Sequence, residues 1–266
     1  MAGNVIMVLA TISSRRLRSI CNMLICLTCL LDILLFTGIV PFLLSVITPI
    51  TQEACYYINI PADFGACASN ALLLSIGVDR LIAVSYPTRY KILPKPKYLL
   101  LIILPPIIYS TTFLIIGFLA KDPTTVVACL IPSSLGIAFV PFAISSVLII
   151  SVVPIVYGYV YIRIKKVQMS TSAKSVFRSL LITVILVICG WMTTDLLGFL
   201  TVVLPIDPIL AHYIQLYCGI FTLSASAMNV FVYYSISKDY RIAIRSLLGY
   251  AKRRMKVGSV PSIQYT

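Results

Sequence analysis

Long apolar stretches, separated by short polar or basic segments, dominate the chain. Six of them cover about residues 20–49, 54–85, 98–120, 134–165, 175–204 and 209–236. Each exceeds the ~20 apolar residues that cross a bilayer as a helix. The pattern therefore predicts six full membrane-spanning helices in an all-α membrane protein.

A shorter apolar stretch opens the chain at about residues 2–13. As a helix it would reach only about 18 Å, against a hydrocarbon core of about 30 Å. It predicts a truncated first helix of about half a span. We expect no signal peptide, because no basic segment precedes the stretch and no small-residue cleavage site follows it.

Residues 238–250 predict a short amphipathic helix at the cytoplasmic face after the last span. Helical spacing places four apolar side chains on one face: Tyr240, Ile244, Leu247 and Leu248. Basic side chains lie on another face: Lys238, Arg241 and Arg245. The gaps between spans hold no long linker or low-complexity tract, so residues 1–266 are predicted to form a single domain.

Composition places the chain in a membrane, because 60% of its residues are hydrophobic, only 11% are charged and the mean hydropathy is +1.02. Of its 21 Lys and Arg residues, all but Lys121 fall on one side of the predicted spans. Cytoplasmic segments collect positive charge. We therefore expect the N-terminus outside and the C-terminus in the cytoplasm, in a plasma membrane. The net charge of +13 then suits anionic lipids rather than nucleic acid.

Asp79-Arg80-Leu81 closes the third span and is followed by Pro87, Arg89 and Tyr90. This run resembles the D-R-Y box and following loop of rhodopsin-like G-protein-coupled receptors. Leu81 stands where the family usually has Tyr. The resemblance implies a seven-transmembrane helix bundle.

Two further motifs match that family with departures. Asn229-Val230-Phe231-Val232-Tyr233 resembles the N-P-x-x-Y motif, with Val230 in place of proline. Because proline kinks a helix, Val230 predicts a straighter end to the seventh helix. Trp191 stands at the tryptophan of the C-W-x-P motif, but Thr193 replaces its proline. The opening residues 3–7 and 17–26 resemble the Srsx class of nematode serpentine chemoreceptors.

The resemblance implies roles for particular residues. Coupling to a heterotrimeric G protein would use Asp79, Arg80, Asn229 and Tyr233. An ion site for a small cation such as sodium would use Asp32, Ser69, Ser226 and Asn229, although a protonated, hydrogen-bonded Asp32 is the alternative. Gly3-Asn4 resembles a pair in the middle of the family's first helix, which implies that the outer half of that helix is missing. No other cofactor is expected.

Six of the eight cysteines lie in apolar stretches, where cysteine behaves as a small hydrophobe. Cys55 begins the third span and Cys129 lies before the fifth, and the charge pattern puts both outside, where disulfides persist. We predict a Cys55–Cys129 disulfide. The 25 residues from Cys55 to Arg80 also match the spacing in the family.

Depth along the spans suggests where a ligand binds. Asp63 and Asp195 each lie 17 residues from a basic residue at the cytoplasmic face, about 26 Å along a helix. Acids facing lipid are costly, so both should face the interior, as ligand contacts or as neutral structural residues. Trp191, Thr194, Ser146 and Thr222 complete the predicted ligand site. Amine receptors of the family carry their acid where Ala62 stands, which argues against a site of that type.

The residues and the resemblance together favour a chemosensory receptor that binds an extracellular small molecule and activates a heterotrimeric G protein. No metal cluster, phosphate loop or nucleophile with a base appears in the sequence, so catalysis is not expected. Retinal would need a lysine in the last span, which has none. Two alternatives stay open: a secondary transporter, and a non-signalling or degenerate receptor-like protein.

Overall fold

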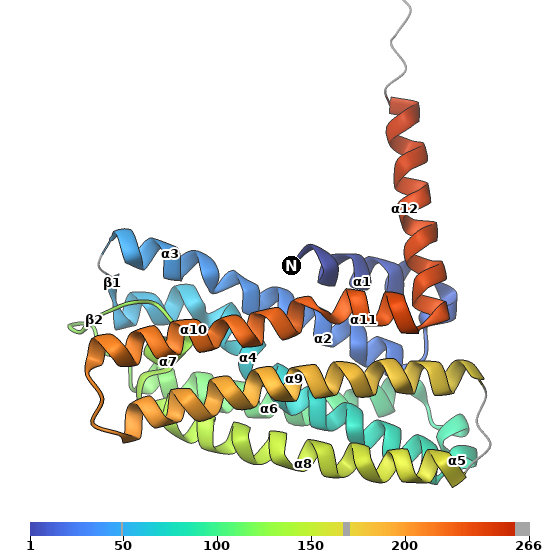
Figure 1. Ribbon diagram of the computed structural model, residues 1–266, viewed down its shortest axis with the longest axis horizontal. Coiled ribbons are helices and arrows are strands. Elements are labelled where there is room, and N and C mark those ends of the chain that lie inside the picture. Colours follow the sequence, from blue (N-terminus) through green and yellow to red (C-terminus); the bar gives the residue numbers. More distant parts are fainter. Residues whose placement is uncertain (49, 167–170, 259–266) are drawn as a thin grey trace, which may run out of the picture.

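The computed structural model describes residues 1–48, 50–166 and 171–258 of the chain as a bundle of long helices (Figure 1). The helices in chain order are α1 (Ala2–Ser13), α2 (Ile20–Thr37), α3 (Ile39–Ile47), α4 (Gln52–Ser85), α5 (Pro87–Ile92), α6 (Lys95–Leu119), α7 (Ile131–Leu135), α8 (Phe139–Lys166), α9 (Thr171–Val203), α10 (Pro208–Ala227), α11 (Asn229–Ile236) and α12 (Lys238–Gly258). Short 3-10 turns precede α2 and α8, at Arg15–Leu17 and Gly136–Ala138. Two short strands pair with each other, β1 (Ile50–Thr51) and β2 (Val126–Val127).

Six segments are long and apolar enough to cross a membrane within the described residues. They are Ile20–Ser45, Gln52–Ser85, Lys95–Leu119, Ile131–Ile164, Val184–Thr201 and Ile209–Ile236. The apolar helix α1 adds a shorter seventh segment. The predicted all-α, seven-helix membrane fold with a short first helix is thus confirmed.

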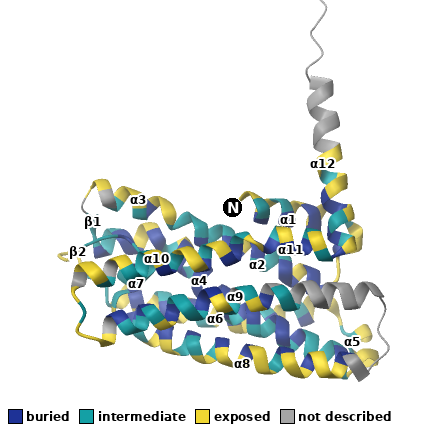
Figure 2. Cartoon of the chain, viewed as in Figure 1, coloured by how far each residue is buried: buried dark blue, intermediate teal, exposed yellow. Residues whose placement is uncertain are grey.

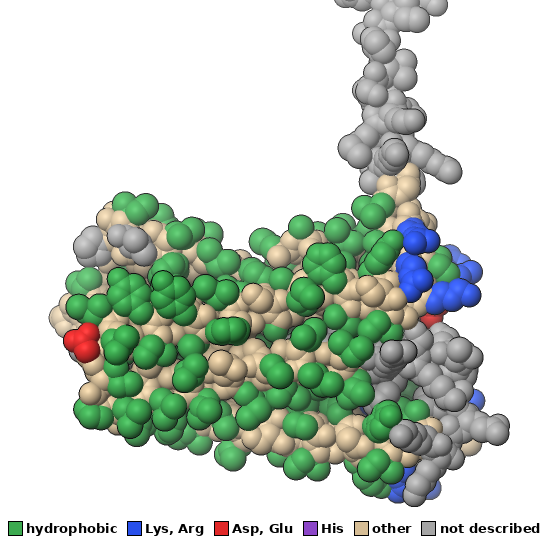
Figure 3. Space-filling view, viewed as in Figure 1, with side chains coloured by type: hydrophobic (Ala, Val, Ile, Leu, Met, Phe, Trp, Pro, Cys, Tyr) green, Lys and Arg blue, Asp and Glu red, His purple; other side chains and the backbone are tan. Residues whose placement is uncertain are grey.

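Side-chain burial agrees with a lipid environment. On the face that Figure 3 shows, the bundle surface is largely hydrophobic, whereas Lys and Arg gather at one end. In the most apolar part of α4, 61% of the residues are buried, whereas in the most apolar part of α6 only 22% are buried. Buried positions therefore concentrate on the inner faces, and α4 is the central helix of the bundle (Figure 2).

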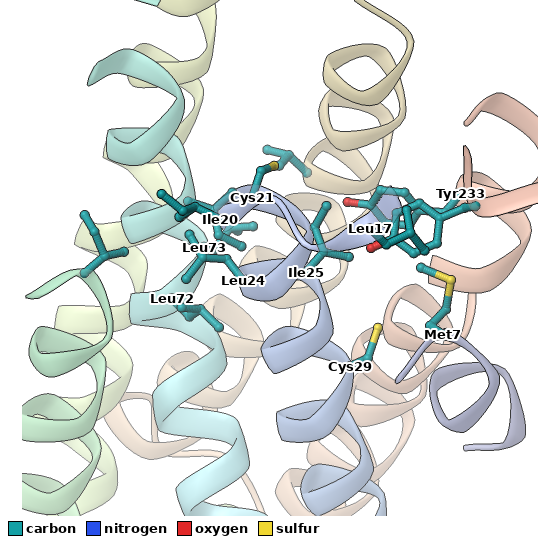
Figure 4. Close-up of a cluster of buried hydrophobic side chains, with 14 of the residues drawn as sticks. Met7, Leu17, Ile20, Cys21, Leu24, Ile25, Cys29, Leu72, Leu73 and Tyr233 are labelled. Carbon is teal, nitrogen blue, oxygen red and sulfur yellow. The ribbon is translucent and has the colours of Figure 1, made fainter. Parts of the chain in front are cut away.

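The largest core cluster joins α1, α2, α4 and α11 near the basic residues (Figure 4). Met7, Leu17, Leu24 and Leu72 are fully buried there, and Tyr233 is 2% exposed. Lipid tails are as apolar as these side chains, so close van der Waals packing rather than removal from water favours the contact. This cluster holds the short α1 against the bundle.

The two ends of the bundle are chemically different. At the basic end lie the start of α12, the 3-10 turn Arg15–Leu17 and α5 with Arg89 and Lys91. At the opposite end, β1 pairs antiparallel with β2, and Cys55 is bonded to Cys129. The predicted disulfide is confirmed, and we call this the disulfide end.

The seventh span is divided into two helices at a single residue, whose backbone stays in the right-handed helical region. It consists of α10 and α11, which are separated at Met228. The backbone N–H of Met228 donates to both Ser224 and Ala225. A shared donation of this kind tightens the turn without any proline. The straighter helix end expected from Val230 stays a prediction.

The helix after the last span buries part of the apolar face that was predicted for it. Tyr240, Ala243 and Ile244 are buried against the bundle, whereas Leu248 is 52% exposed. α12 runs across the long axis of the bundle (Figure 1), so only its first turns can reach the other helices. It also continues to Gly258, beyond the predicted end at residue 250.

Candidate functional site

A cavity of about 310 Å³ lies toward the disulfide end of the bundle, bounded by α2, α3, α4, α8, α9, α10 and the segment that begins α7. Small-molecule sites are commonly about 300–1,000 Å³. Most of the lining is apolar, including Phe42, Phe139 and Phe142. The described lining residues that carry polar side-chain atoms are Asn59, Trp191, Thr194, Asp195, Gln215 and Thr222.

Asp195 is the only acidic side chain among the described residues that line this cavity. It is 3% exposed, and Ser146 of α8 donates a hydrogen bond to its carboxylate. Asn70 of α4 donates in turn to the Ser146 hydroxyl. This chain of hydrogen bonds across three helices fixes the carboxylate at the cavity wall.

Two threonine side chains hold α9 against α10 beside that carboxylate. The hydroxyls of Thr194 and Thr222 are 2.7 Å apart, and Thr194 also donates to the backbone carbonyl of Cys218 at 2.7 Å. About two turns nearer the disulfide end, Gln215 donates to Thr201 at 2.8 Å. The α9–α10 wall of the cavity is therefore joined by polar contacts as well as packing.

Trp191 separates this cavity from a second, smaller one. It is 4% exposed and lines both spaces. The smaller cavity measures about 30 Å³, which is enough for one or two water-sized groups. Movement of this one side chain would change both spaces.

Polar residues from three spans meet at the smaller cavity. Asp32, Ser69, Ser226 and Asn229 all line it. The amide of Asn229 donates to Asp32 at 2.8 Å, and the amide of Asn4 lies 3.5 Å from the same carboxylate oxygen. The buried oxygens Ser69 Oγ and Asn229 Oδ1 have no hydrogen-bond partner among the described residues. Oxygen-donor groups with unused capacity around a carboxylate suit a small cation.

At the basic end of α4, Arg80 folds back on its neighbour Asp79. Arg80 Nε donates to Asp79 at 2.9 Å, and Asp79 is fully buried. Tyr90 of α5 donates to the other carboxylate oxygen at 2.9 Å and accepts from Arg80 at 3.1 Å. Burial raises the pKa of the Tyr90 hydroxyl above its ordinary value.

A family model described as the serpentine type 7TM GPCR chemoreceptor Srsx matches residues 1–248. The chain belongs to this family. No curated protein sequence matches it. The family is one of multi-pass membrane receptors rather than enzymes, and the match extends from α1 into α12.

In this Srsx receptor chain, Asp63 does not line the cavity, although its depth suggested a ligand contact. It is fully buried between α4 and α7, where Asn59 donates to one carboxylate oxygen at 2.9 Å and Ser134 to the other at 2.5 Å. Depth along a helix does not specify which face a side chain occupies. Asp63 therefore joins two structural elements. Ser146 likewise lies outside the lining and acts through Asp195.

Three other residues of the Srsx chain received no site role from sequence reasoning. Asn59 and Gln215 line the large cavity, and Asn4 reaches Asp32. Each is a polar amide within an apolar stretch. Such a residue could have been predicted to face the interior, because a buried amide needs hydrogen-bond partners. The relevant partners are distant in sequence and could not be named from it.

Proposed function

We propose that this chain is a chemosensory receptor that binds a small molecule in the large cavity and activates a heterotrimeric G protein at the basic end. The observation that carries this proposal is the position of Trp191 between the large cavity and the polar cavity of Asp32. A ligand that displaces Trp191 would change the smaller cavity, which Asn229 and Tyr233 also line. Tyr233 belongs to α11 at the basic end.

The proposed switch is a shift between two populations rather than a new covalent state. In the resting arrangement Asp79 and Tyr90 hold Arg80 within the bundle. A ligand that moves α9 would favour the state in which Arg80 leaves Asp79 and meets the G protein. Leu81 departs from the usual D-R-Y motif, but the contacts of Asp79 and Arg80 do not require a tyrosine there.

The proposed orientation places the basic end in the cytoplasm and the disulfide end outside a plasma membrane. All but one of the 21 Lys and Arg residues belong to the cytoplasmic side in this arrangement. Arg241 and Arg245 of α12 contact Tyr234 through its carbonyl and hydroxyl, respectively. α12 would thus lie near anionic headgroups while its buried face holds the bundle.

We propose a small cation, such as sodium, as the occupant of the smaller cavity. Asp32 would supply the charge, and Ser69, Ser226 and Asn229 would supply oxygen ligands. The bound ion would stabilise the arrangement in which these three spans meet.

The G-protein proposal is testable without a known ligand. Asp79→Asn removes the charge that holds Arg80, so basal nucleotide exchange should rise when the protein is reconstituted with G proteins of each main class. Adding Arg80→Ala to that variant should return exchange to the level without receptor. Asp122→Asn, which removes the same charge at the disulfide end, is the matched control. Exchange that is equal in Asp79→Asn and in membranes without receptor would instead favour a non-signalling protein.

A further inference from the structure

The large cavity has one buried polar group whose hydrogen-bonding capacity is unused. Asn59 of α4 lines this cavity and is 1% exposed. Its side-chain oxygen, Oδ1, has no hydrogen-bond partner among the described residues. No other lining residue that the structure describes carries a buried side-chain oxygen or nitrogen of this kind. A buried acceptor without a donor is destabilising, so a ligand that supplies a donor here gains affinity.

A contact with Asp63 holds the amide of Asn59 in one orientation. Nδ2 of Asn59 donates to Oδ1 of Asp63 at 2.9 Å, one helical turn along α4. Ser134 donates to the other oxygen of that carboxyl at 2.5 Å. A proton on this second oxygen would be donated to Ser134, so the contact with Asn59 does not require a charged Asp63. Since Nδ2 is committed to Asp63, Oδ1 is the part of the amide that is left for a ligand.

The residue that faces Oδ1 from the α2–α3 junction has no side chain. Gly38 lies between α2 and α3 and lines the same cavity. A Cβ added to Gly38 would lie 2.9 Å from the Cβ of Ala62 and 3.1 Å from Oδ1 of Asn59. Its backbone is right-handed helical, so glycine is not needed there for an unusual conformation. Glycine lets α4 approach closely and also leaves Oδ1 of Asn59 without a covering side chain.

Several other polar groups of the lining have hydrogen-bond partners within the protein. The hydroxyls of Thr194 and Thr222 pair with each other, and Asp195 accepts a hydrogen bond from Ser146. That bond forms whether the Asp195 carboxyl is charged or neutral, so Asp195 does not fix the charge of a ligand. No Lys, Arg or His occurs among the described lining residues, so an anionic ligand would be buried without a cation. The cavity therefore favours a mainly apolar molecule that is not an anion.

We propose that Asn59 determines ligand specificity: its Oδ1 accepts a hydrogen bond from an N–H or O–H group on a mainly apolar, non-anionic ligand. The apolar part of the ligand packs against Phe42, Phe139 and Phe142 of the cavity wall. A molecule of the same shape without the donor leaves Oδ1 buried and unpaired, and it binds more weakly for that reason. This inference rests on the proposed receptor function and names the ligand class of its cavity.

Two pairs of probes that differ in a single donor test the ligand class. Indole and benzofuran have nearly the same shape, but only indole carries an N–H group. Phenol and toluene differ in the same way at a hydroxyl. Binding to the full chain in lipid nanodiscs is measured by ligand-observed NMR titration, with empty nanodiscs as the reference for probe that dissolves in lipid. The wild type should bind the donor member of each pair at least about tenfold more tightly, a difference of roughly 1.4 kcal/mol.

Matched variants test the residue. Asn59→Leu approximately keeps the shape of the side chain but removes Oδ1, so it should bind both members of each pair about equally. Asn22→Leu is the control, because Oδ1 of Asn22 is also buried without a partner among the described residues, although Asn22 lies outside the cavity lining. It should keep the wild-type preference. Gly38→Ala places a methyl group beside Oδ1 and should reduce the preference without removing the acceptor.

The outcomes separate the parts of the proposal. Equal binding within each pair by the wild type, or no binding of either donor probe, would overturn the ligand class. A wild-type preference in both Asn59→Leu and Gly38→Ala would overturn the role of Asn59. If Asn59→Leu failed to fold, the preference of Gly38→Ala would decide alone. None of these results touches the receptor function, which stands or falls on the nucleotide exchange of Asp79→Asn.

Discussion

Single atoms decide how closely the central helices approach each other, and Gly65 of α4 is the clearest case. A Cβ at this position would lie 2.6 Å from the carbonyl oxygen of Leu31 and 2.8 Å from the amide nitrogen of Leu35. Both neighbours are backbone atoms of α2, so no side chain can rotate away. Small residues at helix contacts are a common means of close packing in membranes. The α2–α4 contact requires glycine here.

We predict that Gly65→Val destabilises the folded receptor by about 1–3 kcal/mol, the usual cost of overpacking a tight core. The melting temperature of the purified protein, followed by intrinsic fluorescence, should fall accordingly. Gly158→Val is the control because the same side chain meets open space there. Equal melting temperatures for the two variants would mean that α2 and α4 can separate at little cost.

At the scale of elements, the disulfide end is stabilised by several separate contacts. The Cys55–Cys129 disulfide joins residues 74 positions apart, and β1 pairs with β2 beside it. Lys121 forms an ion pair with Glu53 and donates to Tyr57. Hydrogen bonds from Thr125 and Thr124 lower the pKa of Asp122 to about 2, so its carboxylate stays charged in more acidic solution than that of an ordinary Asp. The loop is thereby held over the start of α4.

Cys129→Ala should cost about 2–4 kcal/mol of stability, because the disulfide removes conformational freedom from a long loop in the unfolded chain. Less folded protein should reach the cell surface, and its melting temperature should drop. Cys189→Ala, which alters a free and exposed cysteine, is expected to behave as wild type. Wild-type surface expression of Cys129→Ala would show that the strand pair and ion pair are sufficient without the disulfide.

At the scale of the whole molecule, the two cavities and the Asp79–Arg80–Tyr90 cluster follow one another along the bundle. Trp191 lines both cavities, and Tyr233 joins the smaller cavity to α11. Tyr233 also lies against Tyr240 of α12, with ring centroids 5.2 Å apart. The middle of the molecule therefore holds the groups through which the two ends could influence each other.

We predict that sodium stabilises the whole protein through Asp32. A ligand that binds only the folded state adds about 1.4 kcal/mol at ten times its dissociation constant. The melting temperature should rise when sodium chloride replaces choline chloride at equal ionic strength, and Asp32→Asn should abolish this rise. The same shift in wild type and Asp32→Asn would rule out a sodium site at this carboxylate.

Much of this architecture was predictable from one sequence. The apolar stretches are long enough to identify the spans, because a helix of that length satisfies its backbone groups within one segment in lipid. Six of the eight cysteines lie in apolar stretches. Only Cys55 and Cys129 remained for a disulfide, so their pairing could be predicted. Asp32, Ser69, Ser226 and Asn229 were grouped by resemblance, and they do line one cavity.

The sequence by itself determined the number of the spans and predicted their direction, because hydrophobic length and charge are properties of each segment alone. Only the tertiary structure decided which polar side chains face a shared space. Asp63 and Asp195 have similar depth, yet Asp63 joins α4 to α7 and Asp195 lines the cavity. The rotation of each helix about its axis depends on packing against several distant segments at once. Contacts such as Gly65 with α2 set that rotation, and pairings such as Tyr90 with Asp79 follow from it.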